Sequence, residues 1–296
     1  LTDGAGDGAD EAVDAAGSKL EKLKLGAAAL GAAVGAVLMD AMGEALEQSR
    51  ISGKLAASMG KTPAEAQRYG QIAGRLYADA VTEDFQGAAD AIGATMAAGL
   101  LPTGATNAQI EDMSRRVHDL SDTFELDLGQ TANAVGQLIK TGLAKNGVEA
   151  IDAMTRGMQV MGPRADDLAD TFNEYSTIFR QMGISAKDAT GLLSQGMAAG
   201  ARDTDVVADS LKEFVLITQS GGKQVDQAFA KIGLNGKEMQ KAFVEGGPKA
   251  RKALDQVFDG LRGMKDGVDR NNTALTLFGT KSEDTQRALM ALDPSS

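Results

Sequence analysis

The feature that most constrains the fold of this chain is an uncharged run of fifteen residues, LGAAALGAAVGAVLM, from Leu25 to Met39. As an α-helix, this run would span about 22 Å, whereas the hydrocarbon core of a bilayer is about 30 Å thick. Most of its residues are Ala or Gly, which contribute little to membrane insertion. The length and the composition therefore argue against a static transmembrane helix.

The small residues in this run are spaced for close contact between helices. Gly31 and Gly35 are one helical turn apart, Ala27 lies one turn earlier, and Val34 and Leu38 form an accompanying apolar seam. Small residues at this spacing let two helix backbones approach closely, in water or in lipid. We expect the five residues to pack against another helix in an oligomer. Conditional entry into a membrane and burial as an isolated helix remain alternatives.

The rest of the chain carries the pattern of short and medium-length helices. Thr62-Pro63-Ala64-Glu65 combines an N-cap residue, a proline in the first turn and the acidic residue of a capping box. Further helix starts are predicted at Gly162-Pro163, at Ser185 and at Gly247-Pro248. No stretch alternates apolar and polar residues as a half-buried strand does. The sequence predicts an all-α fold with helical hairpins, in which Ala and Gly make the helices thin.

Three helix-loop-helix units are predicted within this pattern. The sequence MAAG occurs at 96–99 and again at 197–200, each time at the end of an Ala-rich helix, and 129–161 has a similar layout. We expect the whole chain to be a piece of a longer protein with four segments. These are a flexible linker or tail (1–18), a small-residue apolar helix segment (19–60), a helical hairpin region (61–232) and a C-terminal motif region (233–296).

The side chains that most enzymes need are scarce. The chain has no Cys and a single His, His118, so zinc hydrolysis, Cys-His catalysis and a Ser-His-Asp triad lack their parts. Gly60-Lys61-Thr62 has neither the first glycine nor the preceding strand of a phosphate-binding loop. A net charge of −11 disfavours stable binding to nucleic acid. We expect a non-enzyme without metal or cofactor, folded in a reducing compartment.

The C-terminal third carries the most distinctive motifs. It reads KIGLNGKEMQKAFVEGGPKARKALDQVFDGLRGMKD and then NNTALTLFGTKSEDTQRALMALDP. This order of a Gly-Leu-x-Gly motif, a short helix, Gly-Gly-Pro, a long helix and Leu-Phe-Gly-Thr-Lys resembles tail tape measure proteins of long-tailed bacteriophages, especially those of actinobacterial hosts. The earlier segments GAAALGAAVGAVLMDAMGEALE and GKLAASMGKTPAEAQRYGQIAGRLYADAV resemble the same family. The resemblance covers about residues 20–293.

The resemblance implies a non-catalytic scaffold in the virion. Such a protein fills the tail tube or reaches the tail tip, sets tail length during assembly in the host cytoplasm, and leaves ahead of the DNA at infection. Its implied partners are copies of itself (a trimer is one option), the tail tube protein, distal tail and baseplate hub proteins, tail assembly chaperones and, transiently, the host membrane. Two alternatives stay open: a membrane-active pore former or injected effector, and a freestanding helical scaffold that binds a soluble partner.

One turn near the C-terminus is a candidate docking element. Leu277 and Phe278 form a bulky pair at a predicted helix end, and Gly279 permits a tight reversal before a helix that Ser282 would cap. Such a turn can staple two helices of the same chain, and it can also offer a surface to a partner protein. The sequence alone leaves both roles open.

Overall fold

The computed structural model describes residues 44–279 and 283–294, and every regular element within them is a helix. The all-α prediction is therefore confirmed. Residues 44–58 are helical. The following helices are α3 (Pro63–Ala78), α4 (Phe85–Ala98), α5 (Asn107–Thr123), α6 (Leu128–Lys140), α7 (Gly147–Met161), the 3-10 helix η1 (Gly162–Ala165), α8 (Leu168–Gln181), α9 (Ala186–Ala198), α10 (Thr204–Ser220), α11 (Lys223–Lys231), α12 (Gly236–Glu245), α13 (Gly247–Gly263), α14 (Val268–Phe278) and α15 (Glu283–Ala291).

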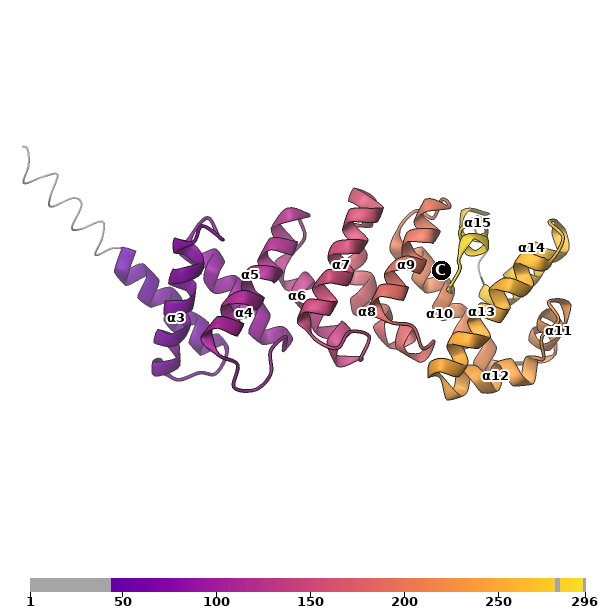
Figure 1. Ribbon diagram of the computed structural model, residues 1–296, viewed down its shortest axis with the longest axis horizontal. Coiled ribbons are helices and arrows are strands. Elements are labelled where there is room, and N and C mark those ends of the chain that lie inside the picture. Colours follow the sequence, from indigo (N-terminus) through magenta and orange to yellow (C-terminus); the bar gives the residue numbers. More distant parts are fainter. Residues whose placement is uncertain (1–43, 280–282, 295–296) are drawn as a thin grey trace, which may run out of the picture.

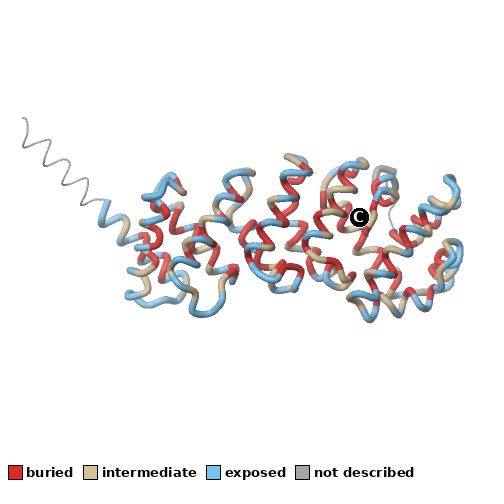
Figure 2. The backbone as a smooth tube through the Cα atoms, viewed as in Figure 1, coloured by how far each residue is buried: buried red, intermediate tan, exposed pale blue. Residues whose placement is uncertain are grey.

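The helices form an elongated array in two layers, which Figure 1 shows running from one end of the molecule to the other. In one layer, α4 packs on α6, α6 on α8 and α8 on α10. In the other layer, α3 packs on α5, α5 on α7 and α7 on α9. The two layers also contact each other, for example through α3 with α4, α4 with α5 and α5 with α6. Buried residues line the faces between the layers along the whole array (Figure 2).

Local capping interactions start α3 and α9 where the sequence predicts them. At the predicted start Gly162-Pro163 the structure has the short 3-10 helix η1 without a side-chain cap. Thr62 accepts a hydrogen bond from the backbone N–H of Glu65, the Glu65 carboxylate accepts one from the backbone of Thr62, and Pro63 occupies the first turn of α3. Ser185 and Asp188 form the same capping box at α9. Because a capping bond joins residues only three apart, it can be predicted without knowledge of the tertiary fold.

The three predicted helix-loop-helix units are present, but their first helices do not all lie in the same layer of the array. The helices α4 and α6 belong to one layer, and each leads into the other layer through a loop. The helix α9, which ends in the second MAAG sequence, belongs to the opposite layer. The two MAAG ends are therefore not equivalent positions of a repeat. The reason is that Gly caps any helix end, whichever layer the helix occupies.

Neighbouring helices approach closely where glycine replaces a side chain. A Cβ atom on Gly136, in α6, would lie 2.6 Å from the backbone oxygen of Ala98, at the end of α4. Real Cβ atoms essentially never come within 3.0 Å of another heavy atom. The separation of α4 and α6 thus depends on the missing side chain at Gly136, as expected for thin helices.

Candidate functional site

The small-residue face predicted to pack in an oligomer, formed by Ala27, Gly31, Val34, Gly35 and Leu38, lies outside the described residues. Its packing role stays a prediction. Among the helices that the structure describes, none has both the length and the apolar character needed to cross a bilayer.

The predicted docking turn lies at the end of α14. The side chains of Leu277 and Phe278 are fully buried, and the N–H of Gly279 donates to the carbonyl of Leu275 at 2.9 Å. Gly279 has a φ of 63°, and a Cβ there would lie 3.2 Å from Cδ1 of Ile217 in α10. In this structure the turn therefore acts as a staple between helices of the same chain. A role in binding a partner protein stays a prediction.

Phe278 belongs to an aromatic cluster that the sequence did not reveal. Its ring stacks on that of Phe214 in α10, with 4.7 Å between centroids, and lies 5.5 Å from that of Phe258 in α13. Phe214 also meets Phe243 of α12 edge to face at 4.9 Å. These four rings join α10 to α12, α13 and α14. The cluster holds the C-terminal helices on the array although aromatic residues make up only 4% of the chain.

A polar network joins α8 to the first turn of α10. The carboxylate of Asp167 accepts hydrogen bonds from the backbone N–H groups of Thr204 (3.3 Å) and Asp205 (2.8 Å), at the start of α10. The hydroxyl of Tyr175 donates to Asp205 at 2.9 Å. Burial, and then this hydrogen bond, raise the pKa of Tyr175 above its ordinary value, so the phenol stays protonated. The network serves as a helix cap and an interhelical tie.

The C-terminal end of the described chain is also held by side chains of the array. Arg262 donates to the carbonyl of Leu292 at 2.6 Å, and Arg251 donates to that of Pro294. Arg251 also pairs with Asp188 at 2.7 Å. Burial alone would raise the pKa of Asp188, but hydrogen bonds from Ser185 and Arg251 outweigh it and hold the pKa below its ordinary value. The helix α15 accordingly packs on α9 and extends that layer.

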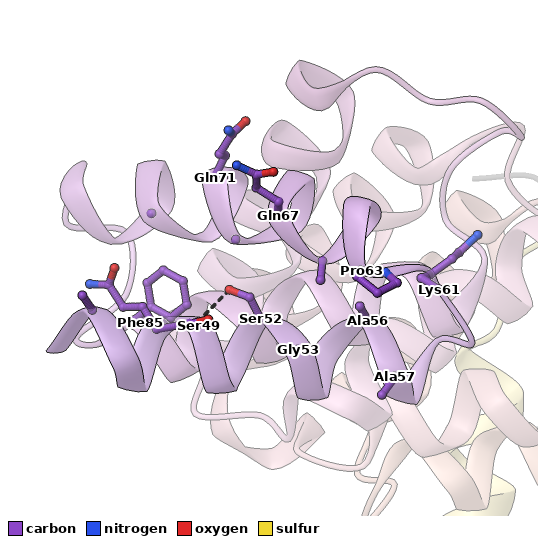
Figure 3. Close-up of a pocket in the computed structure, with 15 residues that line it drawn as sticks. Ser49, Ser52, Gly53, Ala56, Ala57, Lys61, Pro63, Gln67, Gln71 and Phe85 are labelled. Atoms are coloured by element: carbon purple, nitrogen blue, oxygen red, sulfur yellow. Dashed lines mark hydrogen bonds between the residues drawn. The ribbon is translucent and has the colours of Figure 1, made fainter. Parts of the chain in front are cut away.

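Two surface grooves are large enough to accept part of another helix. The first, which we call the N-terminal groove, encloses about 800 Å³ between residues 44–58 and α3 (Figure 3). The second encloses about 850 Å³ between α7 and α9. The N-terminal groove is lined largely by small side chains, namely Ala45, Ser49, Ser52, Gly53, Ala56, Ala57, Pro63, Ala66, Gly70 and Gly74.

The described residues offer no group of three or more His, Cys, Asp or Glu side chains that could hold a metal ion. The Gly60-Lys61-Thr62 segment forms the turn before α3, where the Thr62 hydroxyl is used as the helix cap.

Comparisons with known proteins identify the family. The family described as "Phage-related minor tail protein" matches residues 64–279, which span α3 to α14. The chain is 46% identical over 290 residues to the "Probable tape measure protein" of Streptomyces phage phiC31, an alignment that covers 98% of this chain and 39% of that protein. The chain thus spans well under half the length of this relative. No solved structure matches the chain. Most of the two-layered array is therefore the region that defines the family, and the chain belongs to the phage-related minor tail proteins.

Proposed function

We propose that this chain is a segment of a tail tape measure protein, which sets the length of a phage tail during assembly. The observation that carries the proposal is the 46% identity to a probable tape measure protein across nearly the whole chain. The alignment covers 98% of the chain, so it includes both the array and the aromatic C-terminal block.

The architecture suits a protein that acts through its dimensions. Adjacent packed helices lie about 8–10 Å apart, so each helix added to a layer lengthens the array by about that amount. An extended helix of the same chain would instead rise 1.5 Å per residue, or about 440 Å for the whole chain. Both forms relate length to the number of residues, which is what a ruler requires. Thin helices also suit the narrow lumen of a tail tube.

The proposed role is structural, and its partners are other tail components. Copies of this chain, the tail tube protein, distal tail and hub proteins and assembly chaperones are the expected partners. The net charge of −11 would repel DNA, which lets the genome follow the protein out of the tail without adhering to it. Because each helix contacts mainly its near neighbours in the array, the array can open stepwise during ejection.

An in-frame deletion in the full-length phage protein tests the ruler. Removing residues 127–166 takes out α6, α7 and η1, a two-helix step of the array, and joins Leu126 directly to Asp167. Asp167 is kept because it caps α10. Tail length is then measured by electron microscopy on many virions. A tail about 60 Å shorter indicates that the segment is measured as extended helix, since about 40 residues are lost.

A shortening of only about 10 Å would indicate that the segment is measured as a folded array, which loses one helix from each layer. Both results support a ruler and distinguish its two forms. Virions that carry Gly191→Ala, which removes no residue, serve as the control and should keep the wild-type length. Tails of unchanged length after the deletion would overturn the proposal for this region.

A further inference from the structure

The N-terminal groove has the geometry of an unfilled helix position in the array. Inside the array, α3 packs against both α4 and α5 and so covers the groove between them. The next pair toward the N-terminus is formed by residues 44–58 and α3, and no described helix covers the groove between its members. A Cβ atom on Gly53, in this groove, would meet nothing within 4 Å.

The polar side chain that is buried in the floor of the groove, Ser52, has its own hydrogen-bond partner. A Cβ on Gly70 would lie 2.5 Å from Oγ of Ser52, so the two helices that form the groove touch at this point. The hydroxyl of Ser52 donates to the carbonyl of Gln48 at 2.8 Å, drawn as a dashed line in Figure 3. Because this buried hydroxyl is already satisfied, an occupant of the groove need not supply a polar partner. An apolar helix with small side chains therefore fits this floor.

We propose that the segment Leu25–Met39 of the same chain occupies the N-terminal groove as a helix antiparallel to residues 44–58. Residues 40–43 would form the turn. The array already contains a connection of this length, since α5 ends at Thr123 and α6 begins at Leu128. The fifteen residues give a helix of about 22 Å, and the groove runs along residues 45–57 of the partner helix, which rise about 18 Å.

The antiparallel arrangement fixes which residues face each other. A turn centred near residue 42 places Gly35 opposite Ser49, Gly31 opposite Gly53, and Ala27 opposite Ala57. The three residues of the segment are one helical turn apart, and so are their three partners, all of which line the groove. Small residues thus meet small residues along the whole contact, which permits a close approach of the two backbones.

Filling the groove with a large side chain tests this proposal. In the full chain, Gly53→Trp places an indole where the segment would lie, and amide hydrogen exchange is followed in peptides that cover 25–39. The matched control is Gly191→Trp, which is also within a helix and whose Cβ also meets nothing within 4 Å. We expect slow exchange in the wild type and the control, and exchange about tenfold faster or more in Gly53→Trp. Equal exchange in all three proteins would overturn the proposal.

Cysteine cross-linking distinguishes the same chain from a second copy, because the chain has no Cys of its own. Gly31→Cys with Gly53→Cys should form a disulfide within one chain, with a yield that does not change on dilution. Gly31→Cys with Gly191→Cys should not. Cross-links that join two chains and disappear on dilution would overturn the proposal in favour of an oligomer. Protection of 25–39 that appears only with phosphatidylglycerol vesicles would overturn it in favour of a membrane site.

Discussion

Replacing a single glycine tests the two-layer packing directly. Alanine in the middle of a helix is ordinarily about 0.5–1 kcal/mol more favourable than glycine. At Gly136, however, the new Cβ would lie 2.6 Å from the backbone oxygen of Ala98. The contact must open by about 0.8 Å to reach ordinary van der Waals distance of 3.4 Å. Because the obstacle is backbone rather than a flexible side chain, α4 and α6 must move apart.

Overpacking of this kind costs about 1–3 kcal/mol, which exceeds the gain in helix propensity. Gly136→Ala should therefore lower the free energy of unfolding by about 1–2 kcal/mol. Gly191→Ala, which meets nothing within 4 Å, should raise it by about 0.5–1 kcal/mol. Urea unfolding followed by circular dichroism measures both, and hydrogen exchange in α4 and α6 locates the effect. If Gly136→Ala were as stabilising as Gly191→Ala, α4 and α6 would not approach as described.

Three further predictions follow from the site. Phe278→Ala should lower the free energy of unfolding of α10 to α14 by about 3–5 kcal/mol, measured by urea unfolding. The control Phe124→Ala, at a half-buried ring, should lower it clearly less, and equal losses would argue against the aromatic cluster. Asp167→Ala should remove two hydrogen bonds to the first turn of α10 and cost about 1–2 kcal/mol. Exchange in that turn should become faster, and unchanged exchange there would refute the role. The pKa of Asp188 is lowered on folding, so its stabilisation is present above its ordinary value of 3.8 and is lost as the pH falls through the folded value. Arg251→Met should reduce the loss of unfolding free energy at acidic pH, because Asp188 then lacks its partner. If the unfolding free energy fell with acid as steeply as in the wild type, the pairing would be contradicted.

Much of the candidate site was beyond prediction from the sequence. The order Leu277, Phe278, Gly279 indicated a bulky pair at a helix end, and the structure ends α14 at Phe278 with Gly279 in the left-handed conformation. The partners of Phe278 could not be named, because Phe214 lies more than sixty residues away and nothing local links the two. Likewise, nothing in the local sequence distinguishes Asp167 from other acidic residues, and its bonds to the first turn of α10 could not be predicted.

The sequence by itself determined the helical class, the positions of many helix starts and the family. Capping boxes such as Thr62 with Glu65 join residues three apart, so their chemistry is complete within a short segment. Only the tertiary structure decided the order of helices in the two layers, the aromatic cluster and the N-terminal groove. Helical periodicity shows that a face is buried but not which helix covers it, and the contact of Gly136 with Ala98 or of Phe214 with Phe278 exists only once distant segments have packed.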